Sequence, residues 1–124
     1  MDDARLAALG EAFMESFNSR DFARAAELYA PAAVYESASL VSEENPAGQI
    51  HGREAILAYF GAALAEDLEF HLTMVDQFPG ASMTVVVSTV DGLVFIDVLR
   101  CDDKGLIVHH GEVSPKKSVL LPPS

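Results

Sequence analysis

The sequence predicts an α+β domain in which helices come first and an antiparallel sheet follows. Apolar residues recur three and four positions apart in the N-terminal half, the spacing that lines one face of an amphipathic helix. The C-terminal half contains four β-rich runs separated by short turn motifs. Helices followed by a meander of strands favour packing of all the helices on one face of the sheet.

The chain has 124 residues, half of them apolar, which is the size and composition of one globular domain. We expect the domain to span residues 1–115 and a short irregular tail to occupy residues 116–124. A chain of this length buries roughly two-thirds of its unfolded surface. The sequence therefore has room for both a core and a pocket.

Composition and charge exclude several classes of function. Nineteen acidic and eight basic residues give a net charge of −11, which argues against a nucleic-acid partner because phosphate binding depends on Lys and Arg. The longest uncharged stretch, residues 77–90, is shorter than the ~20 apolar residues of a membrane span. The acidic N-terminus lacks the basic start of a signal peptide, so we expect a cytoplasmic protein without a membrane partner. The single Cys101 and the Cys/His spacing favour neither a disulfide nor a metal site, and we expect no cofactor.

Three helices are expected before the sheet. The first covers residues 3–18, with one apolar stripe. The second begins after Asp21, a suitable N-cap, and extends to Tyr29, before Pro31 stops it. The third covers residues 51–65.

The strands follow the pattern of a short first strand and a later meander. The first is expected at residues 32–37, and a polar loop follows it at residues 38–50. The four later strands are expected at residues 68–78, 82–90, 93–101 and 106–114.

The turns determine which side chains share a face of the sheet. If residues 91–92 form a two-residue turn, Asp97 lies opposite Val86. If residues 102–105 form a four-residue loop, Asp97 lies opposite His110. By the same register, Phe95 lies opposite Glu112 and therefore on the same face as Asp97.

The two faces of the later strands differ in chemistry. One face combines apolar side chains with a few polar groups, as small-molecule pockets do. The other is apolar and β-branched; we expect a second copy of the chain to cover it, which predicts a homodimer. The first face consists of Thr84, Val86, Ser88, Leu93, Phe95, Asp97, Leu99, Val108, His110, Glu112 and Ser114. The second consists of Val85, Val87, Val94, Ile96 and Val98.

Four segments, spread over nearly the whole chain, carry a family resemblance: Phe17-Asn18-Ser19-Arg20-Asp21-Phe22, Leu28-Tyr29-Ala30-Pro31-Ala32-Ala33-Val34-Tyr35, His51-Gly52-Arg53-Glu54-Ala55-Ile56 and Phe95-Ile96-Asp97-Val98-Leu99-Arg100. They resemble the nuclear transport factor two-like superfamily, which includes ketosteroid isomerases, SnoaL-type polyketide cyclases and limonene epoxide hydrolases. The resemblance implies a cystatin-like cone, in which three helices pack on a strongly curved antiparallel sheet around a blind pocket, often as a homodimer.

The resemblance to ketosteroid isomerases covers only part of their site. Asp97 falls where that family keeps a neutral Asp that donates a hydrogen bond to an oxyanion. The family's oxyanion Tyr corresponds to Phe13, its general-base Asp to Ser37 and a further pocket Tyr to Phe60. The resemblance therefore does not imply steroid isomerisation.

This chain adds His110 and Glu112 at positions that are apolar in the isomerases. The polyketide cyclases run an intramolecular aldol reaction in the same pocket with an acid–base Asp helped by His, which is closer to this set. The predicted catalytic residues are therefore Asp97, His110 and Glu112. The predicted substrate-binding residues are Phe13, Phe17, Tyr35, Phe60, Val86, Phe95 and Leu99.

Structural roles remain open for each polar residue. Asp97 could be neutralised by Arg100 at the rim, and His110 or Glu112 could simply reach water near the ends of their strand. Glu36 and His71 could each face the pocket or the solvent.

The leading hypothesis is a cofactor-independent enzyme that uses general acid–base catalysis on a hydrophobic substrate. The preferred reaction is cyclisation or isomerisation of a polyketide- or terpenoid-like carbonyl compound. One alternative is an epoxide hydrolase-like enzyme, although Phe95 stands two positions before Asp97, where the resemblance would require Arg. The other alternative is a non-catalytic ligand-binding or association module.

Overall fold

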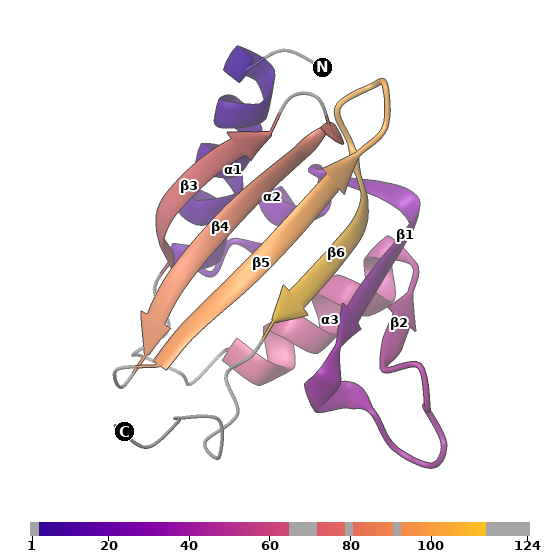
Figure 1. Ribbon diagram of the computed structural model, residues 1–124. Helices are drawn as coiled ribbons and strands as arrows, with labels where there is room; N and C mark the ends of the chain where they lie inside the picture. The colour runs from indigo at the N-terminus through magenta and orange to yellow at the C-terminus, as the bar shows by residue number, and fades with distance from the viewer. Residues whose placement is uncertain (1–2, 65–71, 79–80, 91–92, 114–124) are drawn as a thin grey trace.

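The computed structural model describes residues 3–64, 72–78, 81–90 and 93–113 (Figure 1). Its helices are α1 (Asp3–Asn18), α2 (Phe22–Ala26) and α3 (Arg53–Leu64), with a 3-10 turn at Ala38–Leu40. Its strands are β1 (Tyr29–Ser37), β2 (Gln49–His51), β3 (Leu72–Phe78), β4 (Met83–Val90), β5 (Leu93–Cys101) and β6 (Ile107–Val113).

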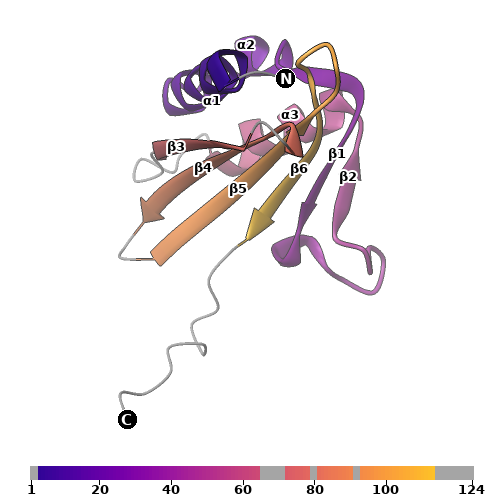
Figure 2. The same ribbon diagram turned by 45° about the horizontal axis from the view of Figure 1, so that its top comes forward.

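The strands form one six-stranded sheet in the order β2-β1-β6-β5-β4-β3. The helices lie on one side of this sheet (Figure 2), so the predicted α+β fold is confirmed. All pairs are antiparallel except β1 and β6, which run parallel, so the sheet is mixed. The reason is topological, because the chain leaves β2 through α3 for the far edge at β3 and returns by a meander.

The second helix is shorter than predicted and the first strand is longer. Asp21 caps α2 as expected, with its side chain accepting from the backbone N–H of Arg24. The helix ends at Ala26, and Tyr29 begins β1 because it pairs with Ile107 of β6. The predicted loop at residues 38–50 also contributes the start of β2, which pairs with β1.

The β4–β5 register is as predicted, with Asp97 opposite Val86. The β5–β6 register differs from the prediction by two residues, because an irregularity follows the loop between these strands. Asp97 lies opposite Glu112, and His110 lies opposite Leu99. Because side chains alternate along a strand, a shift by two residues leaves Asp97, His110 and Glu112 on their predicted face.

Val108 is the exception on that strand. The register changes next to it, between the pairs Arg100–His109 and Cys101–Ile107. Ile107 therefore turns inward and is fully buried, while 38% of Val108 is exposed. The prediction that Val108 lies on the pocket face is wrong because a bulge reverses the alternation of the side chains there.

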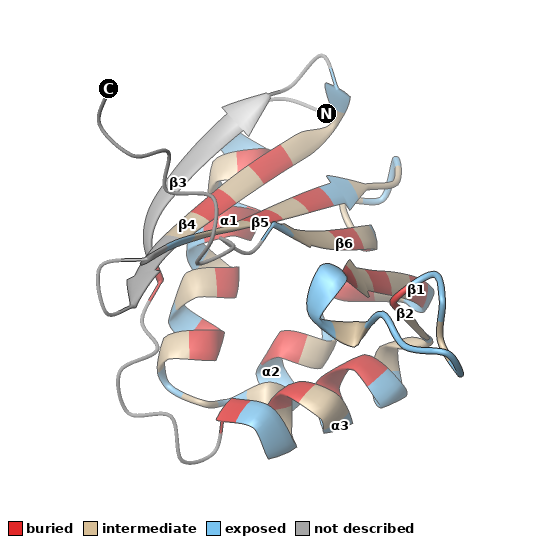
Figure 3. Cartoon of the chain, turned by 60° about the horizontal axis from the view of Figure 1, so that its bottom comes forward, coloured by how far each residue is buried: buried red, intermediate tan, exposed pale blue. Residues whose placement is uncertain are grey.

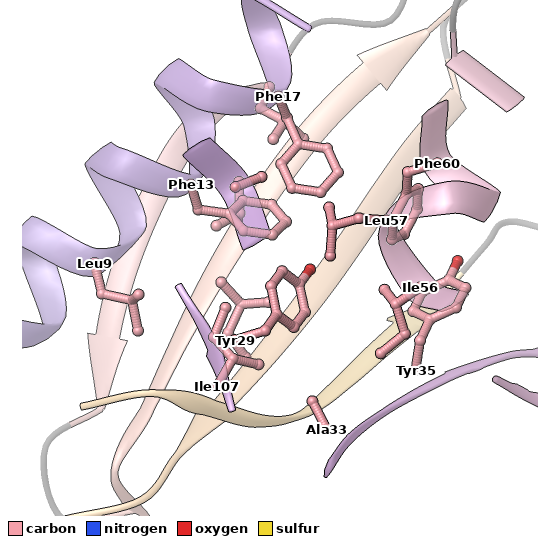
Figure 4. Close-up of a cluster of buried hydrophobic side chains, with 14 of the residues drawn as sticks. Leu9, Phe13, Phe17, Tyr29, Ala33, Tyr35, Ile56, Leu57, Phe60 and Ile107 are labelled. Carbon is pink, nitrogen blue, oxygen red and sulfur yellow. The ribbon is translucent and has the colours of Figure 1, made fainter. Parts of the chain in front are cut away.

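The core lies between the helices and the inner face of the sheet. Buried residues occupy the sides of α1 and α3 that face the strands (Figure 3). Side chains from both helices and from β1 and β6 meet in one cluster (Figure 4), which includes Leu9, Phe13, Phe17, Tyr29, Ala33, Tyr35, Ile56, Leu57, Phe60 and Ile107. Fully burying one large apolar side chain of this kind contributes about 1.5–3 kcal/mol.

The outer face of the sheet is apolar and only partly covered. Val94 is 49% exposed, and Val85, Val87, Ile96 and Val98 are half-buried. Among the helices of the described residues, none is long and apolar enough to cross a membrane.

Candidate functional site

A cavity of about 80 Å³ lies between α1, α3 and the inner face of the sheet. Five aromatic rings form much of its wall, and three titratable side chains reach it from β5 and β6. One of its lining residues, Ala63 of α3, is exposed. Its lining residues are Phe13, Phe17, Tyr35, Tyr59, Phe60, Ala63, Leu64, Asp97, His110 and Glu112.

Asp97 and His110 form a buried hydrogen-bonded pair in this cavity. Nε2 of His110 lies 2.6 Å from Oδ1 of Asp97. His110 is fully buried and Asp97 is 4% exposed. The two residues are diagonal neighbours on adjacent strands, a position from which long and aromatic side chains still meet. The predicted partnership is therefore present, although the residues are not directly opposite each other.

Tyr29 completes a chain of three groups behind this pair. Its hydroxyl lies 2.8 Å from Nδ1 of His110, so both ring nitrogens of the histidine have partners. Tyr29 is fully buried and lies outside the cavity wall, with its ring pointing inward among the side chains of α1 and α3 (Figure 4). Burial, and next the negative charge of Asp97, raise the pKa of the Tyr29 hydroxyl well above its usual value.

The imidazole of His110 is enclosed by aromatic rings. Phe60 stacks on it with ring centroids 5.5 Å apart, and Tyr35 and Phe13 meet it edge-on at 4.8 and 5.4 Å. These rings exclude water, and the resulting low local dielectric strengthens the polar contacts of His110.

Glu112 brings a second carboxylate to the cavity from the position opposite Asp97. The hydroxyl of Ser37 donates a hydrogen bond to Oε1 of Glu112 at 3.2 Å. Tyr35 lines the same region, and burial together with the charge of Glu112 raises the pKa of its hydroxyl well above the usual range. Tyr35 is thus a neutral O–H group beside two acids.

Residues 11–110 match the family model of the SnoaL-like domain. The chain belongs to the SnoaL-like domain family. The matched segment contains Asp97 and His110 and ends just before Glu112. No curated protein matches the sequence.

Solved structures share the fold at low sequence identity. A SnoaL-like protein of unknown function from Burkholderia thailandensis superposes with a TM-score of 0.81 at 16% identity, over 94% of this chain and 99% of that one. A steroid delta-isomerase from Pseudomonas aeruginosa gives a TM-score of 0.69 at 21% identity, over 94% and 83% of the two chains. The candidate polyketide cyclase IdmH from Streptomyces antibioticus gives 0.63 at 23% identity, over 88% and 91%. These identities show a common fold alone.

In this SnoaL-like protein, most of the predicted site residues meet at the cavity. The exceptions among the predicted substrate-binding residues are Val86, Phe95 and Leu99, which are not part of the cavity wall formed by the described residues. Val86 and Leu99 are fully buried in the core behind it, and Phe95 is half-buried on β5. The residues that do line the cavity are Phe13, Phe17, Tyr35, Phe60, Asp97, His110 and Glu112.

Other residues left open by the sequence lie elsewhere. Arg100 is exposed and His110 is the partner of Asp97 instead. Glu36 faces outward and accepts a hydrogen bond from Gln49 at 2.9 Å, while His109 approaches it at 3.6 Å. His71 lies outside the described residues. Over residues 3–64, 72–78, 81–90 and 93–113, no cluster of three or more His, Cys, Asp or Glu side chains could hold a metal ion.

The sequence did not predict the contact of Tyr29 with His110, nor that Tyr59, Ala63 and Leu64 line the cavity. The sequence pattern predicts Tyr29 at the end of the second helix, so its contact with His110 was not expected. That contact depends on the parallel pairing of β1 with β6. The signal that could have revealed it is the Leu28-Tyr29-Ala30-Pro31 segment, since a strand that starts before the proline turns Tyr29 toward the core.

Proposed function

We propose that this protein is an enzyme that moves a proton next to a carbonyl group, without a cofactor. The preferred reaction is cyclisation or isomerisation of a polyketide- or terpenoid-like compound. The observation that carries this proposal is the buried Asp97–His110 pair, held at 2.6 Å in a cavity walled by aromatic rings. A carboxyl group held by a fixed partner in a dry pocket is suited to general acid–base catalysis.

In the proposed reaction, Asp97 removes a proton from the carbon next to the carbonyl group. The electron pair of the broken C–H bond moves into the carbonyl system, and the oxygen becomes an enolate. The neutral hydroxyl of Tyr35, which lines the cavity, is proposed to donate a hydrogen bond to that oxygen. The proton then returns from Asp97 to another carbon in an isomerisation, or to the new alkoxide when the enolate carbon attacks a second carbonyl. Glu112 is proposed to orient the substrate or to act as a second base.

The size of the cavity limits how the substrate binds. Its volume of about 80 Å³ is well below the ~300–1,000 Å³ of pockets that enclose a drug-sized ligand. The proposal is therefore that only the reacting carbonyl end enters, past Ala63, while the rest of the molecule stays at the mouth.

The epoxide hydrolase alternative is less well supported. That activity would need an arginine between carboxylates, and no arginine lines the cavity within the described part of the chain. Arg20, the arginine near the C-terminal end of α1, donates to the backbone oxygens of Phe17 and Leu64.

The test is deuterium exchange at the carbons next to the carbonyl of small ketones, from acetone to cyclohexenone, followed by proton NMR in D₂O. Wild-type protein is expected to accelerate exchange, and Asp97→Asn to lower that acceleration by about 10²–10⁴-fold. The matched control is Asp103→Asn, which makes the same change at an exposed loop position. Binding of these ketones without any exchange would support the non-catalytic binding module instead.

A further inference from the structure

We infer that Tyr29 is a positioning residue that holds His110 as a neutral imidazole protonated on Nε2, so that a substrate exchanges its proton only with Oδ2 of Asp97. The first part concerns the resting protein and needs no substrate. The assignment of Oδ2 rests on the proposed function.

The direction of the first hydrogen bond follows from the burial of Tyr29. Its side chain is fully buried, and its hydroxyl has one hydrogen-bond partner in the described part of the chain, Nδ1 of His110. A buried O–H group without an acceptor is costly. Because burial raises the pKa of this hydroxyl, the group keeps its proton. Tyr29 therefore donates its hydrogen, and Nδ1 accepts it.

The direction of the second hydrogen bond follows from the first. A nitrogen that accepts a hydrogen bond carries no proton, and a neutral imidazole has one N–H group, which must then be Nε2. This N–H donates to Oδ1 of Asp97 across 2.6 Å. In an imidazolium, or in the tautomer with the proton on Nδ1, this nitrogen would donate to the Tyr29 oxygen, and the hydroxyl hydrogen would then have no acceptor among the described residues.

This directed chain separates the roles of Asp97 and His110. Both ring nitrogens of His110 are engaged within the protein, so neither is open to a substrate. Oδ1 of Asp97 accepts the hydrogen bond from Nε2 of His110 throughout, and Asp97 itself lines the cavity. The proton of the reaction is therefore carried by Oδ2. His110 is thus a positioning residue in this scheme, whereas the sequence predicts it to be one of three catalytic residues with Asp97 and Glu112.

Other titratable groups face the same cavity and belong in the design of the test. Glu112 stands opposite Asp97 on β6, and Tyr35 and Tyr59 reach the wall from β1 and α3. The rings of Tyr35 and His110 have centroids 4.8 Å apart, which makes Tyr35 a matched control for Tyr29. Tyr35→Phe removes the same hydroxyl group as Tyr29→Phe, from a ring that also contacts the imidazole of His110.

The experiment is ¹⁵N–¹H long-range correlation NMR of protein labelled at its four histidines, at neutral pH, with His110 assigned from the signals that His110→Gln loses. Wild-type His110 is expected to show a protonated Nε2 and an unprotonated Nδ1. In Tyr29→Phe, the fraction of His110 with a proton on Nδ1 should rise by about tenfold, since losing one such hydrogen bond changes an equilibrium by roughly that factor. In Tyr35→Phe that fraction should stay as in wild type, although both variants lose a buried hydroxyl.

Two results would overturn the inference. One is a wild-type His110 that carries its proton on Nδ1, which decides the matter even if Tyr29→Phe fails to fold. The other is a folded Tyr29→Phe whose His110 signals match the wild type. Absence of ketone exchange in a protein with the Nε2 tautomer would refute the proposed function and leave the role of Tyr29 intact.

Discussion

His109 and His110 are neighbours on β6, and they point to opposite faces of the same sheet. The inner histidine, His110, is fully buried, with partners 2.6 and 2.8 Å from its two nitrogens. The outer histidine, His109, keeps about a third of its side chain exposed and lies 3.6 Å from the half-exposed carboxylate of Glu36. The same residue type thus occupies two different electrostatic settings one position apart.

The difference shows which contacts hold a polar side chain in place. Exposed ion pairs contribute roughly 0–1 kcal/mol because water and salt screen them. A buried polar group that loses its hydrogen-bond partner destabilises the folded protein by its full desolvation penalty. Removing a polar group from the inner face of the sheet should therefore change stability and activity strongly. On the outer face, changes to the apolar surface should mainly affect dimerisation.

The largest expected effect concerns the chemistry of the inner face. Turnover of a Δ5-3-ketosteroid should be negligible, because the resemblance to the ketosteroid isomerases aligns Phe13 and Ser37 with the oxyanion donor and the general base of those enzymes. Losing such groups costs orders of magnitude in rate. The check is the absorbance of the conjugated enone product, and efficient turnover would show that the inner polar groups substitute for the missing pair.

The next prediction tests the difference between the two histidines through the stability of two variants. His110→Leu leaves Asp97 and the Tyr29 hydroxyl buried without a partner, and should lower the free energy of unfolding by about 3–5 kcal/mol. His109→Leu should change it by less than about 0.5 kcal/mol, as expected for a half-exposed pair. Urea denaturation of the two variants measures both, and equal losses would contradict the distinction between the faces.

On the outer face, the expected effect is on assembly. We predict that the protein is a homodimer through the apolar surface of Val85, Val87, Val94, Ile96 and Val98. Ile96→Lys would bury a charge in that interface and should weaken dimerisation at least about tenfold, equivalent to about 1.4 kcal/mol. Sedimentation equilibrium is the measurement, with Ala62→Lys on the exposed side of α3 as the control. A wild-type monomer at micromolar concentration would refute this prediction.

The smallest expected effect is on how the free energy of unfolding changes with pH. Burial raises the pKa of Tyr29 and Tyr35 above the value of 10.0 for a free tyrosine, so these groups ionise at that pH only in the unfolded chain. Their contribution to stability is complete below pH 10 and is lost as the pH rises above it, by about 1.4 kcal/mol per pH unit for each tyrosine. Tyr29→Phe should therefore reduce the slope of the unfolding free energy above pH 10. An unchanged slope would mean that Tyr29 ionises in the folded protein.

Much of the fold could be predicted because the strongest local signals agree with the final structure. The β4–β5 register followed from a two-residue turn and alternation alone. The length of α2 could not be predicted, since pairing of Tyr29 with Ile107 in a distant strand competes with helix formation. The bulge at the start of β6 was equally hidden, because loop length in a sequence does not reveal an extra unpaired residue.

The sequence predicts which residues line the cavity better than it predicts the contacts between them. Asp97, His110 and Glu112 meet at one cavity because the two-residue register error left the faces unchanged. The part played by Tyr29 could not be read from spacing, since it depends on a parallel contact between residues 81 positions apart. Phe95 was placed on the correct face, yet the described cavity wall does not include it.

The parallel pairing of β1 with β6 has a consequence for the synthesis of the chain. His110 follows Tyr29 by 81 residues, so the hydrogen bond between them cannot form before β6 has been synthesised. Until then the inner side of β1 and the apolar sides of α1 and α3 lack part of their cover. Contacts between segments so distant in sequence form late and slowly. The same strand that completes the site thus also ends the period in which the nascent chain is most prone to aggregation.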